Sequence, residues 1–167
     1  MDVLQAIRGR RSVRKFKTDP VEDALVQAVL EAGSWAPSWA NTQCWRFGIV
    51  RHPGTRAQLA ELASPRNPAA EAIKTAPVVI AVCAELAQAG YYKGEPKTDK
   101  GDWYLFDTAL ATENIVLAAN ALGLGTVIVG HFDSAKAAQL LKIPSSHRIV
   151  VLIPLGYPAE APAARPR

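Results

Sequence analysis

Two short stretches of this 167-residue chain group side chains that could bind one ligand from two sides. The first, which we call the phosphate clamp, places three guanidinium groups and a hydroxyl at Arg10, Arg11, Ser12 and Arg14. An arginine fork suits anions with several oxygens, because two parallel N–H donors can meet two oxygens. The second, the amide loop of residues 36–43 (Ala-Pro-Ser-Trp-Ala-Asn-Thr-Gln), suits the polar edge of a flat heterocycle. Together they predict a phosphorylated aromatic cofactor.

Periodicity and turn residues predict the elements that position these groups. A helix is expected over Asp2–Arg8, directly before the clamp. Asp19-Pro20 indicates the start of a helix that ends near Gly33, before the amide loop. The longest helix, apolar enough to be central, is predicted over Trp103–Leu122. Further helices are expected over residues 53–63, 69–74 and 134–141, and strands over 45–51, 77–84, 126–129 and 148–155.

From this pattern alone the chain is an α/β or α+β sandwich. Its length suits one domain over residues 1–167, in which Pro158–Arg167 forms an extended tail rich in proline and alanine. Gly90–Gly101 is polar and rich in lysine and glycine, and we expect a mobile loop there.

Composition excludes several classes of protein. Hydrophobic residues make up 49% and charged residues 20%, which argues against disorder. The net charge of +4 gathers in Arg8–Lys17 and at Arg165 and Arg167, so we expect no nucleic-acid partner. The apolar runs are too short to cross a membrane and the first twenty residues lack a signal-peptide core, which predicts a cytoplasmic protein. Cys44, Cys83 and the histidines have no metal-ligand spacing.

In their order along nearly the whole chain, these motifs resemble the nitroreductase family of FMN-dependent oxidoreductases. The segments that carry the resemblance are Arg10–Phe16, Ala36–Phe47, Thr75–Pro77, Leu122–Thr126 and Leu155–Pro158. The resemblance implies an α+β fold with a mixed, mostly antiparallel sheet of about four strands flanked by helices. It also implies an intertwined homodimer with FMN sites at the interface.

The resemblance assigns FMN-binding roles to residues of both stretches. It implies that Arg10, Arg11 and Ser12 bind the phosphate and ribityl chain, and that Arg14 reaches the pyrimidine end of the ring. A cation there is useful, because reduced flavin develops negative charge at N1. The amide loop is implied to come from the other subunit, and its site residues are Pro37, Ser38, Trp39, Asn41 and Gln43.

Two later segments complete the implied site. Ile128, Val129 and Gly130 match the strand end that lies along the flavin, where the Gly130 N–H would donate to N5. Arg165 and Arg167 match a basic pair that closes over the phosphate. A packed aromatic remains an equal interpretation of Trp39, and a charged chain end remains one for the terminal arginines. The family usually has proline where this chain has Cys44, which we do not expect to be catalytic.

We therefore expect tightly bound FMN, NADH or NADPH as co-substrate, and a small, flat acceptor such as a nitroaromatic or quinone, served by a ping-pong mechanism. No dinucleotide fingerprint is present, which fits a nicotinamide that visits the flavin. One alternative uses reduced FMN for flavin fragmentation, dehalogenation or ring dehydrogenation. Another is a non-catalytic module that binds anions, which predicts a colourless protein and affinity that falls steeply with salt.

Overall fold

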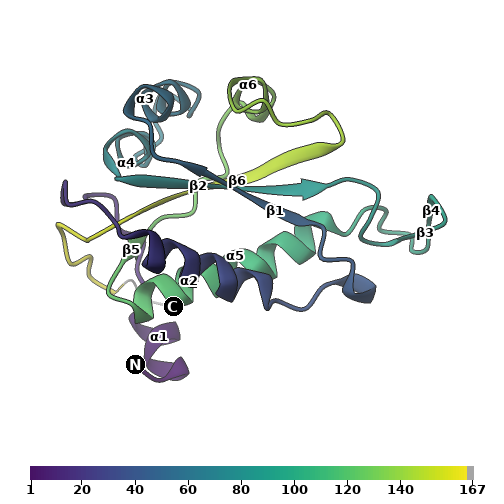
Figure 1. The fold of residues 1–167 in the computed structure, drawn as a ribbon, viewed down its shortest axis with the longest axis horizontal. Helices are drawn as coiled ribbons and strands as arrows, with labels where there is room; N and C mark the ends of the chain where they lie inside the picture. The colour runs from purple at the N-terminus through teal and green to yellow at the C-terminus, as the bar shows by residue number, and fades with distance from the viewer. Residues whose placement is uncertain (165–167) are drawn as a thin grey trace.

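A computed structural model describes residues 1–164 of the chain (Figure 1). A four-stranded sheet forms the middle layer, and helices cover both of its faces. The helices are α1 (Val3–Gly9), α2 (Asp23–Ser34), the 3-10 turn η1 (Trp39–Asn41), α3 (Pro53–Glu61), α4 (Ala70–Thr75), α5 (Tyr104–Ala121) and α6 (Ser134–Leu140). The strands are β1 (Trp45–Val50), β2 (Val78–Glu85), β3 (Tyr91–Tyr92), β4 (Glu95–Pro96), β5 (Gly125–Thr126) and β6 (His147–Gly156).

The main sheet has the order β1-β2-β6-β5, and each neighbouring pair is antiparallel. An isolated parallel bridge between Ser12 and Thr126 adds the segment after α1 to its β5 end. The α+β sandwich with a mostly antiparallel sheet is therefore confirmed.

Alternate residues of β2 divide the apolar core between the two faces of the sheet, as the two-residue period of a strand requires. Val79 and Ala81 pack on the side of α3, α4 and α6, whereas Ile80 and Val82 pack on the side of α2 and α5. Figure 1 shows the first group of helices above the sheet and α1, α2 and α5 below it. β2 is buried on both faces, as its continuous apolar run predicts.

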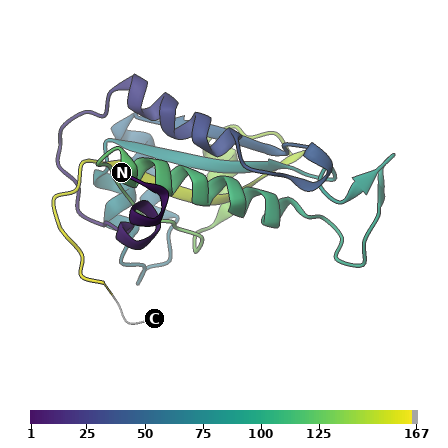
Figure 2. The same ribbon diagram turned by 90° about the horizontal axis from the view of Figure 1, so that it is seen from below.

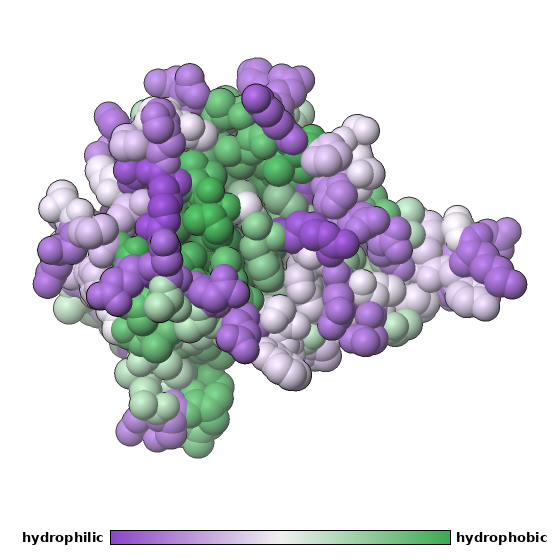
Figure 3. Space-filling view, in the orientation of Figure 1, coloured by the Kyte–Doolittle hydropathy of each residue, from purple (hydrophilic) through white to green (hydrophobic). Residues whose placement is uncertain are grey.

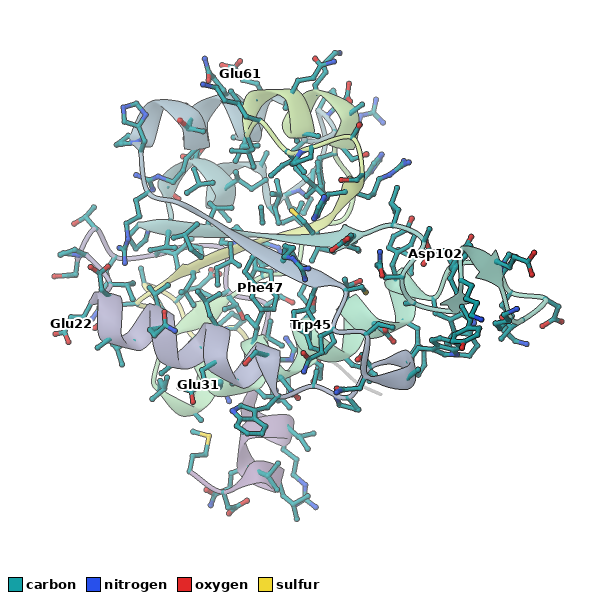
Figure 4. All side chains as sticks on the ribbon, turned by 45° about the vertical axis from the view of Figure 1, so that its right-hand side comes forward. Glu22, Glu31, Trp45, Phe47, Glu61 and Asp102 are labelled. Atoms are coloured by element: carbon teal, nitrogen blue, oxygen red, sulfur yellow. The ribbon has the colours of Figure 1, made fainter. Side chains whose placement is uncertain are left out.

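α5 is the central helix of the lower layer, as its apolar sequence predicts. Ile115, Val116 and Ala119 on it are fully buried beneath the sheet. Trp45 and Phe47 of β1 point toward this layer and pack on α2 and α5 (Figure 4). The 18 residues of α5 span about 27 Å, so the two ends of this helix lie in different parts of the molecule.

The predicted start of α2 at Asp19-Pro20 is wrong, because the helix begins at Asp23. Tertiary contacts hold the preceding segment extended. Val21 is buried, and Arg51 donates to its carbonyl oxygen at 3.0 Å and to the Asp23 carboxylate at 2.6 Å. These contacts override the local helix-start signal.

The expected loop over Gly90–Gly101 contains a small hairpin of β3 and β4, which projects from the body of the protein (Figure 2). Lys93 and Gly94 form its turn with φ of 53° and 80°, the left-handed pair that two-residue hairpin turns use. The Trp103 indole N–H donates to Thr98 Oγ1 at 2.8 Å and anchors its base. No helix within residues 1–164 is long and apolar enough to cross a membrane.

Candidate functional site

The phosphate clamp follows α1 and runs beside the segment that leads out of α5. Asp2 caps α1 by accepting from the Gln5 N–H at 2.9 Å. The Val13 N–H donates to the Thr126 carbonyl oxygen at 2.9 Å. A Cβ on Gly125 would lie 2.9 Å from Val13 Cβ, so glycine permits this close approach.

A cavity of about 380 Å³ opens where these segments meet. Arg10 and Arg11 form part of its wall, together with the glycine-rich turn at 123–125 and the chain at 158–162. The Asn120 side chain also lines it and donates to the Ala6 carbonyl oxygen at 3.1 Å. This bond ties the end of α5 to α1, directly before the clamp.

The guanidinium groups of the clamp are not neutralised by ion pairs within residues 1–164. Arg11 donates to the carbonyl oxygens of Arg8 and Arg10, at 2.6 and 2.9 Å. Arg14 donates from Nη1 to the Ser12 carbonyl oxygen at 3.3 Å, and its buried Nε finds no acceptor in the described chain. Arg10 and Arg11 thus give the cavity a cationic wall, which suits an anion such as a phosphate, whereas Ser12 and Arg14 lie outside its lining.

The tail after β6 docks against the clamp. Glu160 accepts from the backbone N–H groups of Arg14 and Lys15, at 2.7 and 3.3 Å. The Ala159 N–H donates to the Lys15 carbonyl oxygen at 2.9 Å. The predicted site residues Arg165 and Arg167 lie outside the described residues.

The segment after β5 runs along β6. The Val129 side chain is buried in the upper core, and its N–H and C=O both pair with Leu152, at 2.9 Å each. Ile128 and Gly130, on either side of it, are exposed. If this strand end contacts a ligand, the contact would therefore come from residues 128 and 130, because the Val129 side chain is buried in the core and its backbone groups pair with Leu152.

The amide loop has an unusual backbone. Ala40, Asn41 and Gln43 adopt φ of 46°, 57° and 48°, the left-handed region that residues with a Cβ rarely enter. Such strain persists where the surroundings over-determine it, and it is concentrated at functional sites. Pro37, Asn41 and Gln43 are exposed, whereas Ser38 and Trp39 are half-buried.

Three side chains form hydrogen bonds with the loop, and one of them is Arg46, which donates to the Gln43 carbonyl oxygen at 3.0 Å. Ser38 Oγ accepts from the Gln43 N–H at 3.0 Å within the loop itself. Asp107, on α5, accepts from the Trp39 N–H with both carboxylate oxygens, at 3.1 Å each. Asp107 was missed by the sequence analysis, although an acid within an otherwise apolar helical stretch was a signal that could have revealed it.

Burial controls the protonation of the groups behind the loop. It raises the pKa of Asp107, an effect that hydrogen bonds from the Trp39 N–H and the Cys44 thiol oppose. Burial, with the charge of Asp107 nearby, also raises the pKa of Cys44 to about 12. A thiol that stays protonated is a poor nucleophile, which agrees with the expectation that Cys44 is not catalytic.

The structure therefore brings together some of the predicted site residues and separates others. The clamp lies beside the C-terminal end of α5 and the amide loop beside its N-terminal end, whereas residues 128–130 run along β6. Asp107 and Asn120 mark these two ends, about 20 Å apart along the helix.

Comparison with known proteins identifies the family. Residues 7–157 match the Nitroreductase family. The chain belongs to the nitroreductase family. It is 34% identical over 169 residues to a Methanothermobacter thermautotrophicus protein whose name gives NADH dehydrogenase and NAD(P)H nitroreductase as alternatives, covering 99% of this chain and 82% of that protein. It is 30% identical over 181 residues to 5,6-dimethylbenzimidazole synthase of Rhodospirillum rubrum, covering 95% of this chain and 83% of that protein.

A solved nitroreductase family protein from Clostridium novyi NT has the same fold. Its TM-score is 0.86 at 30% identity, over 95% of this chain and 87% of that one. The resemblance drawn from motif order is thus confirmed. As a member of the nitroreductase family, the chain is an oxidoreductase.

Proposed function

We propose that this nitroreductase is a homodimeric enzyme that binds FMN tightly and carries hydride from NADH or NADPH to small, flat acceptors such as nitroaromatics or quinones. The observation that carries the proposal is the placement of two complementary half-sites at opposite ends of α5. One half supplies cations and the other supplies amide groups, and a flavin mononucleotide needs both.

The distance between the half-sites supports an interface site. Within one chain the clamp and the amide loop lie about 20 Å apart along α5, which is too far for both to surround the same part of one ligand. A two-fold dimer solves this problem, because it places the clamp of one subunit against the amide loop of its partner. Each dimer would then contain two equivalent sites.

Exposed apolar side chains near both half-sites support the same assembly. On α1, Val3, Leu4 and Ile7 are exposed, and Figure 3 shows apolar surface over this helix. On the first turn of α5, Leu105 and Phe106 are each more than half exposed. Clustered apolar surface of this kind marks interaction sites in soluble proteins.

The residues present fit FMN. Clamp arginines that form no ion pair within residues 1–164, one of them with a buried Nε that finds no acceptor there, would hold the phosphate and ribityl chain together with Ser12. Arg14 would stabilise negative charge at the pyrimidine end of the ring. Asn41 would offer its amide to polar atoms of the cofactor, and the Gly130 N–H would donate toward N5. FMN itself supplies the hydride-transfer chemistry when bound.

Substrate exchange follows from this arrangement. NAD(P)H and the acceptor would visit one open face in turn, because the chain carries no dinucleotide fingerprint of its own. The amide loop and the half-buried Trp39 would limit water access at that face. We place this ping-pong reaction in the cytoplasm.

The visible absorption spectrum of the purified protein, before and after FMN loading and desalting, tests the proposal. We expect a retained flavin spectrum that bleaches anaerobically with NADH or NADPH, and the faster donor identifies the preferred nucleotide. A protein that stays colourless after loading would contradict the proposal and favour the anion-binding module.

A mixing experiment tests the interface site. Arg14→Ala damages the clamp and Asn41→Ala damages the loop, so each pure variant should bind FMN poorly at limiting concentration. Random exchange of subunits should restore about a quarter of the sites, because each mixed dimer regains one intact pair of half-sites. If mixing restores no binding, the site does not combine two chains.

A second candidate activity is a specialised reaction of reduced FMN, such as flavin fragmentation, dehalogenation or ring dehydrogenation. The 30% identity to 5,6-dimethylbenzimidazole synthase over 95% of the chain favours keeping it. Continuous NAD(P)H oxidation that depends on a nitroaromatic or quinone acceptor would favour the first activity. Consumption of bound flavin without such turnover would favour the second.

A further inference from the structure

The first turns of α5 carry a carboxyl group to which the proposed chemistry gives no role. Asp107 is fully buried and forms no ion pair within residues 1–164. A carboxylate removed from water without a cation is unfavourable for folding. Its side-chain contacts are the Trp39 N–H, which both oxygens accept at 3.1 Å, and the Cys44 thiol, whose sulfur lies 3.9 Å from Oδ2. Both contacts belong to the amide loop or adjoin it.

The loop needs such a hold. Three of its residues, Ala40, Asn41 and Gln43, occupy the left-handed region, where a Cβ is strained. The bond from the Gln43 N–H to Ser38 Oγ closes the loop on itself, but it does not tie the loop to the rest of the protein. Arg46 of β1 holds the end of the loop by donating to the Gln43 carbonyl oxygen at 3.0 Å, and Asp107 ties its middle to α5 across 68 positions of the sequence.

We propose that Asp107 is a positioning residue, whose buried carboxylate holds Trp39–Gln43 in the strained conformation that presents Asn41 and Gln43 to the cofactor. That Asp107 holds the loop is inferred from the hydrogen bonds of this chain. That it thereby affects FMN binding rests on the proposed function. The side chain itself does not touch the flavin in this scheme. Its effect on affinity and rate passes through the backbone of the amide loop.

The charge of Asp107 is part of this role, because hydrogen bonds to a carboxylate are stronger than those to a neutral oxygen. The titratable groups around it are few. Cys44 faces it from the start of β1, and Asp102 lies at the base of the hairpin (Figure 4). Arg46 acts on Cys44 from the same strand. Burial and the negative charge of Asp102 both raise the pKa of Asp107, so it gains a proton at a higher pH than an exposed aspartate.

The first test compares Asp107→Ala and Asp107→Asn with Thr108→Val. Thr108 is a matched control, because it is equally buried on α5 but donates to the Tyr104 carbonyl oxygen of its own helix. NMR amide exchange at Trp39 should accelerate at least tenfold in Asp107→Ala and change little in Thr108→Val, since the Trp39 N–H has lost its acceptor only in the first variant. This measurement needs no FMN.

The second test is FMN affinity as a function of pH. We expect Asp107→Asn to bind FMN about threefold to tenfold more weakly than wild type at neutral pH. As the pH falls, wild type should converge on the value of Asp107→Asn, because protonation removes the same charge. The ratio of the two affinities cancels the titration of the FMN phosphate, which both proteins bind alike.

A rescue variant separates positioning from a general structural effect. Ala40→Gly relieves the left-handed strain at that residue, so it should recover part of the FMN affinity lost in Asp107→Ala. Unchanged exchange at Trp39 in Asp107→Ala would overturn the proposal, and so would accelerated exchange with wild-type FMN affinity. If wild type binds no FMN, the proposed function fails, while the exchange rates still decide whether Asp107 holds the loop.

Discussion

The two half-sites at the ends of α5 are built in opposite ways. The clamp is rich in charge and has ordinary backbone geometry, with segments tied by main-chain bonds such as Val13 to Thr126. The amide loop carries no charged side chain but has a strained backbone, tied to the protein through the carboxylate of Asp107. The clamp therefore offers affinity through side-chain charge, whereas the loop offers orientation through backbone shape.

Because of this difference, mutations should affect the two half-sites in different ways. Removing a cation from the clamp should weaken binding without disturbing the fold, because its arginines are not part of ion pairs in residues 1–164. Changing the loop should alter its conformation first and binding second. The predictions below test this contrast, beginning with the largest effect.

Arg14→Ala should cost about 1.5–3 kcal/mol of FMN affinity, the typical contribution of a hydrogen bond to a charged group. The free energy of unfolding should change little. Flavin fluorescence quenching gives the affinity and urea unfolding gives the stability. Arg66→Ala, which removes an exposed arginine outside the clamp, is the control for net charge. Equal FMN affinity in Arg14→Ala and wild type would show that Arg14 is wrongly assigned.

Gly125→Ala should lower the free energy of unfolding by roughly 1–3 kcal/mol, as overpacking does. The added methyl would lie 2.9 Å from Val13 Cβ and Cγ1, and Val13 cannot move away without straining its bond to Thr126. Gly48→Ala is the matched control, because its Cβ would meet Ala81 at an ordinary 3.6 Å. Similar unfolding midpoints for the two variants would contradict the close packing described for the clamp.

Ala40→Gly should stabilise the protein by about 0.5 kcal/mol, because glycine enters the left-handed region without the strain of a Cβ. Ala109→Gly, at an exposed position within α5, should instead lose about 1 kcal/mol through helix propensity. Thermal or urea unfolding of both variants checks the opposite signs. A loss of stability in Ala40→Gly would mean that this part of the loop is not strained.

Sequence patterns predicted most elements because their signals are local. β2 and α5 follow from an apolar run and from a long apolar helix, and burial confirms both. The errors lie where distant contacts prevail. Arg51 holds the segment before α2 extended, although Asp19-Pro20 favours an earlier helix start. The hairpin turn at Lys93-Gly94 was interpreted as loop, because strands of two residues leave almost no periodic pattern.

The candidate site shows the same division. The sequence could single out the clamp arginines as candidates, because three guanidinium groups fall within five residues, and their role at a phosphate stays a prediction. The role of Asp107 was not, because its bond to Trp39 depends on the packing of α5 against the loop. Nor could the sequence reveal that the Val129 side chain points into the core while Ile128 and Gly130 are exposed.

The smallest predicted effect is the pH dependence of stability that arises from Asp107. Burial raises its pKa, and hydrogen bonds from the loop offset part of that shift. The folded protein therefore binds this proton more tightly than the unfolded chain does. It follows that stability falls as the pH rises through the folded-state pKa, and that the cost of the buried charge is fully present above it.

Asp107→Asn lacks this titration. The difference in unfolding free energy, wild type minus variant, should therefore become more positive as the pH is lowered from neutral through the raised pKa of Asp107. Urea unfolding of both proteins between neutral and mildly acidic pH measures it. The FMN affinity of wild type should fall as the pH is lowered over the same range. The reason is that the charged carboxylate destabilises the folded state but holds the loop. Parallel trends in stability and affinity would contradict this account.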